Sequence, residues 1–180
     1  MKMFFAYFKY LIRHKWYVLV ECFKIGLYWR GIVHDMSKFL PSEFLPYMRY
    51  FYGDYKSIQG YHGDMRNRIL DTGLYSEKVQ EDFDRAWLYH QKKNKHHWQF
   101  WILKEDSGKT KVLEMPEKYR KECLCDWIGA GKAQGKVSPK EDPIREVRNW
   151  YLMNQDNIIM HPKTERAIRI DIYSKKLWKP

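Results

Sequence analysis

Residues 4–23 read FFAYFKYLIRHKWYVLVECF, and their apolar side chains recur at spacings of three and four residues. That period places one apolar face along an α-helix, whereas a half-buried strand would alternate with a period of two. The pattern continues to residue 32, with Gly26 and Gly31 as candidate breaks before a second helix. The sequence therefore predicts that the chain begins with helices over residues 4–32.

Helical patterns recur along the rest of the chain. Proline or a capping residue followed by an acidic residue marks three helix starts, at Leu40-Pro41, at Ser76-Glu77 and at Met115-Pro116. We expect helices from residue 40, over 76–103, from 115 to about 130, over 144–158 and over 163–177, joined by loops at 53–63, 104–111 and 135–143. The sequence predicts one all-α domain over residues 1–180, with C-terminal helices over about 144–180 packed on its core.

Composition narrows the class of protein. The chain has 33 Lys plus Arg against 22 Asp plus Glu, a net charge of +11, and its 44% hydrophobic content excludes a disordered chain. An odd set of three cysteines (Cys22, Cys123, Cys125) argues against a disulfide framework and favours buried, reduced thiols in a cytoplasmic protein. Charged residues interrupt the apolar N-terminus, so we expect neither a signal peptide nor a membrane partner.

Histidines and aspartates stand in apolar surroundings at separated points of the chain. His34-Asp35 ends an apolar stretch, and adjacent imidazole and carboxylate groups can bind a divalent metal together, with the carboxylate able to bridge two ions. Asp126 lies within Cys-Leu-Cys-Asp-Trp-Ile, where an unpaired buried carboxylate would be costly. The other histidines of this series precede or lie between these acids: His14, His90, His96 and His97.

The order His, His-Asp, His, His, Asp over successive helices resembles the HD-domain superfamily of metal-dependent phosphohydrolases. Lys38 and Pro41 follow Asp35 as in some of its members. More closely, the chain resembles an uncharacterised HD-like family of Firmicutes and their phages, through Gly-Leu-Tyr-Trp-Arg-Gly-Ile-Val-His-Asp-Met-Ser-Lys-Phe, Ala-Trp-Leu-Tyr-His-Gln-Lys-Lys-Asn-Lys-His-His-Trp, Met-Pro-Glu-Lys-Tyr and Cys-Asp-Trp.

The superfamily resemblance implies one or two divalent ions (Mn, Fe, Mg, Zn or Co) that activate water for attack on a phosphoester, with Asp35, Lys38 and His96 as catalytic residues. The metal ligands that it implies are His14, His34, Asp35, His90, His97 and Asp126. Each histidine also has a purely structural interpretation, at the surface or in the core. On one helix, His90 and His97 would lie about 10 Å apart along the axis, so either two ions lie along that face or the helix breaks near Asn94.

The basic residues suggest an anionic substrate, either a nucleotide or another small phosphoester. Lys38, on the helical face of Asp35, is expected to contact a phosphate oxygen. Trp98 could stack on a base or belong to the core, as aromatic residues at helical spacing usually do. Three further lysines surround the histidine pair and could bind the substrate or form a solvated helix face: Lys92, Lys93 and Lys95. Two other functions fit the same sequence, a di-iron oxygenase on this scaffold and a basic nucleic-acid or nucleotide-binding protein without catalysis.

Overall fold

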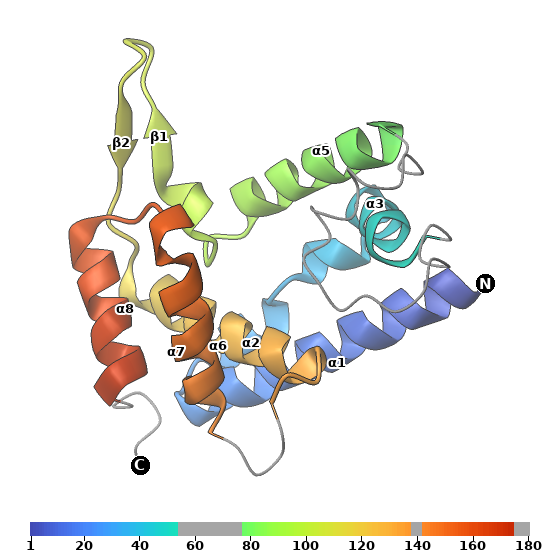
Figure 1. The fold of residues 1–180 in the computed structure, drawn as a ribbon, viewed down its shortest axis with the longest axis horizontal. Coiled ribbons are helices and arrows are strands. Elements are labelled where there is room, and N and C mark those ends of the chain that lie inside the picture. Colours follow the sequence, from blue (N-terminus) through green and yellow to red (C-terminus); the bar gives the residue numbers. More distant parts are fainter. Residues whose placement is uncertain (54–76, 138–141, 175–180) are drawn as a thin grey trace. The chain divides into compact units, whose positions relative to one another are not determined.

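The computed structural model describes residues 1–53, 77–137 and 142–174, and these residues form seven α-helices and one β-hairpin (Figure 1). The all-α prediction is therefore confirmed. Residues 54–63 of the loop predicted at 53–63, residues 138–141 of the loop predicted at 135–143 and the end of the last helix at 175–177 lie outside the described residues. The elements are α1 (Lys2–Lys24), α2 (Tyr28–Val33), α3 (Pro41–Tyr52), α5 (Glu77–Lys93), β1 (Ile102–Lys104), β2 (Thr110–Val112), α6 (Glu117–Ala133), α7 (Pro143–Asn154) and α8 (Pro162–Ser174).

The chain divides into two compact units. One comprises residues 1–9 and 36–90 and is called here the aromatic unit; the other comprises residues 10–35 and 91–180 and is called the histidine unit. The aromatic unit is built on packed rings: the centroids of Tyr7 and Phe44 lie 4.8 Å apart in a tilted pair, and those of Tyr50 and Phe83 lie 3.8 Å apart in a stacked pair. Its helix α3 begins at Pro41, as the sequence predicts. The single-domain organisation stays a prediction.

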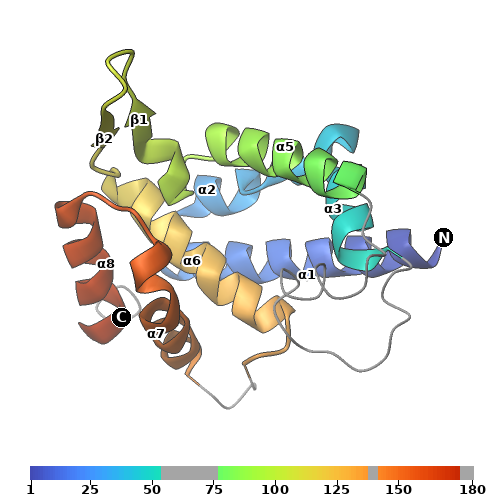
Figure 2. The same cartoon turned by 45° about the horizontal axis from the view of Figure 1, so that its top comes forward.

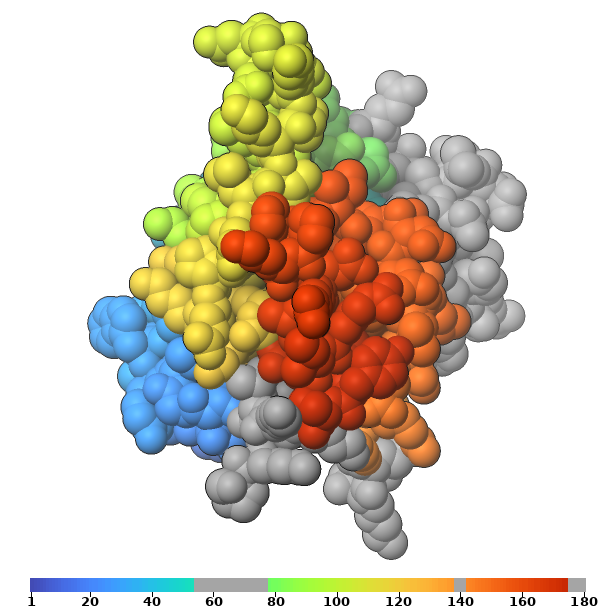
Figure 3. All heavy atoms as spheres, turned by 90° about the vertical axis from the view of Figure 1, so that its left-hand side faces the viewer, coloured from blue at the N-terminus to red at the C-terminus, as the bar shows by residue number. Residues whose placement is uncertain are grey.

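The histidine unit contains α6, α7 and α8, which pack side by side (Figure 2). Their shared core is fully buried and consists of Leu124, Ile128, Ile144, Val147, Tyr151, Ile168 and Ile172. Asp142 caps α7 by accepting a hydrogen bond from the Ile144 backbone N–H at 3.0 Å, which fixes where this helix begins. The space-filling view in Figure 3 shows the side of the histidine unit on which α8 lies in the middle, with the hairpin of β1 and β2 projecting above it.

Two glycines allow α2 and α6 to approach α1 closely. A Cβ at Gly129 on α6 would lie 2.4 Å from Cγ2 of Val18, and one at Gly31 on α2 would lie 2.9 Å from Cβ of Cys22. Because no real side-chain carbon tolerates such contacts, only glycine permits this spacing. Gly31 therefore does not break the helix as predicted, whereas Gly26 does lie at the break between α1 and α2, with φ of +74°.

The helix predicted over 76–103 is wrong beyond Lys93. The chain turns at Asn94, passes through a 3-10 turn over Trp98–Trp101 and enters β1, which pairs antiparallel with β2 in the register Leu103↔Lys111. Gly108, with φ of +81°, lies in the connection that the sequence marks as a turn. Strands of three residues are too short to show the alternation by which a sequence reveals them.

The cysteines and the apolar helices were also the subject of predictions. Cys22, Cys123 and Cys125 are buried and free, as expected. Among the described helices, none combines the length and the apolar character that crossing a bilayer requires.

Candidate metal centre

The centre forms where the end of α2 meets the middle of α1. Lys15 donates to the backbone carbonyls of Ile32 and His34, at 2.7 Å each, and so satisfies acceptors that the end of α2 leaves open. Asp35 then adopts a left-handed backbone conformation, with φ of 51°. This sharp change of direction places the His34 and Asp35 side chains beside His14, which precedes Lys15 on α1.

Asp126 on α6 completes a group of four. Its Oδ1 lies 3.1 Å from Nε2 of His14 and 3.4 Å from Nε2 of His34. Oδ2 of Asp35 lies 3.8 Å and 3.4 Å from the same two nitrogens. Each of the four residues offers one ligand atom, and these atoms all lie within 4.8 Å of one another. Two imidazoles and two carboxylates at this spacing are able to hold a divalent ion.

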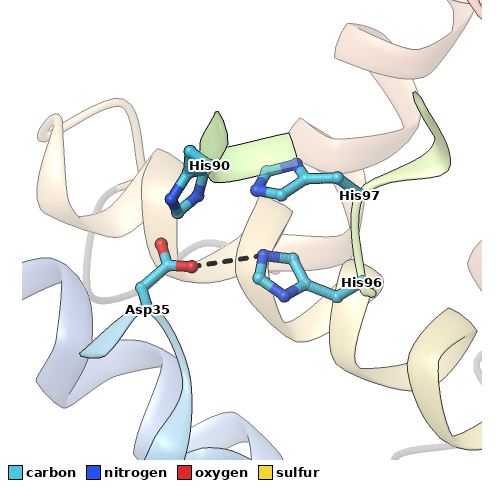
Figure 4. A group of neighbouring side chains, drawn as sticks. All are labelled: Asp35, His90, His96 and His97. Atoms are coloured by element: carbon cyan, nitrogen blue, oxygen red, sulfur yellow. Dashed lines mark ion pairs between the residues drawn. The ribbon is translucent and has the colours of Figure 1, made fainter. Parts of the chain in front are cut away.

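The histidine pair approaches the other oxygen of Asp35. Nε2 of His96 lies 3.4 Å from Oδ1, and Figure 4 shows His96 and His97 turned toward this carboxylate. The helix break positions the pair, because the indole N–H of Trp101 donates to the backbone carbonyl of Lys95 at 2.9 Å. The two oxygens of Asp35 thus face different imidazoles, an arrangement in which one carboxylate could serve two ions.

Glu122 is a member of the cluster that sequence reasoning missed. Its Oε1 lies 3.2 Å from Nδ1 of His34 and 3.4 Å from Nδ1 of His96. Arg30 contacts both carboxylate oxygens, through Nε at 2.6 Å and through Nη2 at 3.0 Å. One feature of the sequence could have identified it, because Glu122 lies four residues before Asp126 and so on the same face of a helix.

The carboxylates give the centre a strong negative potential. Burial lowers the pKa of His34, but the surrounding acids outweigh burial and raise this pKa to about 10, with Asp35 contributing most. Burial also lowers the pKa of His96, and the adjacent His34 adds to that effect. A potential that stabilises a proton on one imidazole so strongly also attracts a divalent cation.

Two of the carboxylates, Glu122 and Asp126, stay ionised despite their burial. Burial raises the pKa of Glu122, but hydrogen bonds from His34, His96 and Arg30 reverse that effect and lower the pKa to about 2. Burial likewise opposes ionisation of Asp126, yet its two imidazole partners lower its pKa well below the usual range. Ionised carboxylates are the form that binds a metal ion.

Comparison with protein families adds one identification. A sequence model of a family of unknown function (DUF5662) matches residues 3–172. The chain belongs to this family. No curated protein and no solved structure matches the chain.

Two predicted site residues of this DUF5662 chain belong to the aromatic unit, so their roles stay predictions. Nδ1 of His90 lies 2.8 Å from Oε2 of Glu43, which also accepts a hydrogen bond from Ser37. Nζ of Lys38 lies 5.7 Å from the centroid of the Tyr47 ring. The expectation that Lys38 shares a helical face with Asp35 is wrong, because α2 ends at Val33 and a separate 3-10 turn begins only at Met36.

The remaining predicted residues of the DUF5662 chain surround the helix break. Lys92, Lys93 and Lys95 are exposed, and Trp98 is half-buried. Lys92 donates to the backbone carbonyl of Gln99 at 3.5 Å, and Nζ of Lys95 lies 5.7 Å from the centroid of the Phe100 ring. Their roles in binding a substrate stay predictions.

Proposed function

We propose that the chain is a metal-dependent phosphohydrolase that acts on a nucleotide or another small phosphoester. One observation carries the proposal: imidazoles and carboxylates from α1, from the turn after α2 and from α6 converge in one largely buried centre, with His14, Asp35 and Asp126 as its corners. Such convergence of buried ionisable groups is costly in free energy unless a cation compensates it. The order of these residues along the chain is also that of the superfamily which the sequence resembles.

The donor set fits a divalent transition metal. Imidazole nitrogens together with carboxylate oxygens favour Mn, Fe, Co or Zn over the all-oxygen sites typical of Mg. His14, His34, Asp35 and Asp126 would hold a first ion, and His96 and His97 stand beside the second oxygen of Asp35. A divalent ion bound there supplies Lewis-acid activation of water and of a phosphoryl oxygen.

The protein groups around the centre would receive the anionic substrate. Lys92, Lys93 and Lys95 are exposed next to the histidine pair, and a net charge of +11 favours the approach of anions. His96, buried and with a lowered pKa, favours its neutral form and can therefore offer a lone pair. Lys38 is proposed to neutralise charge that develops on the phosphoryl group.

Purified protein loaded with Mn²⁺ or anaerobically with Fe²⁺ provides the test. A panel of nucleoside monophosphates, a phosphomonoester and a phosphodiester of p-nitrophenol, and cyclic nucleotides should contain a substrate whose turnover needs metal and is lost in His14→Ala. The exposed control Asp156→Asn should keep turnover. Metal-loaded protein that hydrolyses nothing in the panel would contradict the proposal. Oxygen consumption by the iron form, or nucleic-acid binding that weakens steeply with salt, would then support one of the two alternatives.

A further inference from the structure

Arg30 and Glu122 form an ion pair, and each precedes a residue of the metal centre by four positions. Arg30 precedes His34 by four residues, and Glu122 precedes Asp126 by four residues on α6. Residues four apart lie on one helical face, so Glu122 lies one turn before Asp126 on α6. Arg30 on α2 likewise lies one turn before His34, the C-cap residue of that helix. The ion pair is bidentate, with Arg30 donating to both carboxylate oxygens.

Glu122 contacts the imidazoles on the side that faces away from the aspartates. Its Oε1 lies within 3.4 Å of Nδ1 of both His34 and His96, whereas the Nε2 atoms of these rings lie 3.4 Å from oxygens of Asp35. A ring that donates its Nδ1 proton to a carboxylate keeps the Nε2 lone pair for a metal. Glu122 is hydrogen-bonded to Nδ1 of His34, and the same oxygen lies 3.4 Å from Nδ1 of His96, close enough to orient both rings.

Direct ligation by Glu122 fits this geometry poorly. The Arg30 guanidinium occupies both carboxylate oxygens, and a cation at the same oxygens would be repelled by it. The guanidinium also lies over the Tyr119 ring, 5.0 Å from its centroid, which restricts its movement. These contacts favour a role for Glu122 in orienting the imidazoles rather than in binding the metal itself.

We propose that Arg30 and Glu122 are positioning residues that fix the protonated nitrogen and the orientation of His34 and His96, and thereby set metal affinity. The inference rests on the proposed function only in requiring that the centre binds a divalent ion. It needs no particular substrate or reaction. Outer-shell carboxylates of this kind typically contribute a factor of about 10–100 to metal affinity.

Metal affinity, measured without substrate, is the first test. The dissociation constant for Co²⁺ or Zn²⁺, obtained by competition with a fluorescent chelator at fixed pH, should rise about 10–100-fold in Glu122→Gln. Arg30→Met, which changes no candidate ligand, should raise it in the same direction. Metal stoichiometry should be unchanged, since no ligand is removed.

Glu21 supplies a matched control. It is buried and accepts hydrogen bonds from Lys24 at 2.8 Å and from Lys132 at 2.5 Å, so Glu21→Gln disturbs a comparable buried ion pair whose cations are lysines rather than Arg30. Glu21→Gln should retain wild-type affinity within about threefold. Equal weakening in Glu21→Gln and Glu122→Gln would overturn the inference, as would wild-type affinity in Glu122→Gln.

A spectroscopic measurement on wild-type protein covers the case in which the variants do not fold. In Zn²⁺-loaded, ¹⁵N-histidine-labelled protein, the metal-bound nitrogen of His34 and of His96 should be Nε2, with a slowly exchanging proton on Nδ1. Ligation through Nδ1 in either ring would overturn the inference. Protein that binds zinc in this way but hydrolyses no phosphoester would contradict the proposed function alone.

Discussion

At the scale of single residues, Asp126 lies close to three imidazoles of the centre, as Asp35 does. Oδ1 of Asp126 lies within 3.4 Å of two imidazoles, and its Oδ2 lies 3.9 Å from Nε2 of His96. On the same face of α6, one turn earlier, Glu122 is held by Arg30. Removing the charge of Asp126 should therefore affect the metal more than the fold.

Asp126→Asn keeps the size of the side chain and removes the negative charge. We expect metal affinity to fall by about 100-fold or more, since a direct ligand should contribute at least as much as an outer-shell group. Metal content after purification, determined by elemental analysis, is the measurement. Asp156→Asn, an exposed change, should keep full content. A variant at position 126 with wild-type content would place the ligands elsewhere.

Lys38→Met removes a charge while keeping most of the apolar stem. Against a phosphoester that the wild type hydrolyses, we expect kcat/KM to fall roughly 100-fold, equivalent to about 2.7 kcal/mol of transition-state stabilisation. Metal content and melting temperature should stay unchanged. Lys78→Met, at an exposed position of α5, is the control. Full turnover in Lys38→Met would exclude Lys38 from the reaction, and loss of metal or fold would indicate a structural role.

At the scale of helices, the centre depends on how closely α1 and α6 approach. Gly129 lies against Val18, and this contact is one turn from Asp126 on α6 and one turn from His14 on α1. Two glycines on one helix offer a comparison, because a Cβ at Gly131 would make only ordinary contacts of 3.5 Å.

Gly129→Ala should destabilise the protein by about 1–3 kcal/mol, because the added Cβ must push α1 and α6 apart. The same displacement should weaken metal binding. Gly131→Ala should be neutral or stabilise by up to about 1 kcal/mol, since alanine favours a helix interior. Urea denaturation of both variants, with metal affinity measured in parallel, checks the pair. Equal stability of the two variants would show that the close approach at Gly129 carries no such strain.

The sequence predicted the helices better than their ends and connections. Periodic apolar residues and proline starts predicted α1, α3 and α6, because both signals are local. The hairpin was missed because its strands have three residues each. Glu122 was missed for a different reason: its burial depends on Arg30, 92 positions earlier in the chain, and no local pattern encodes that pairing.

At the scale of the whole molecule, the net charge of the chain is positive, whereas the charge of the carboxylates in the candidate metal centre is negative. The net charge is +11, yet Asp35 and Glu122 are almost completely buried within one cluster of imidazoles. A ligand that binds only the folded protein stabilises it by mass action. A divalent ion at the centre should therefore contribute to the stability of the entire chain.

Removal of metal should lower the melting temperature. At a free metal concentration of about 100 times the dissociation constant, binding stabilises by about 2.7 kcal/mol, or roughly 5–10 °C for a chain of this size. Differential scanning calorimetry with Mn²⁺ and with a chelator gives the shift. His14→Ala should show no difference between the two conditions. An equal response of His14→Ala and wild type would indicate that the ion stabilises the protein from another site.

The most direct test of the metal centre is the anomalous diffraction signal of a crystal grown with Mn²⁺. We expect a peak in contact with Nε2 of His14, Nε2 of His34 and carboxylate oxygens of Asp35 and Asp126. Difference density for a second ion beside His96 would add to this result. A crystal that binds Mn²⁺ only at other residues, with these four side chains in direct contact with one another, would contradict it.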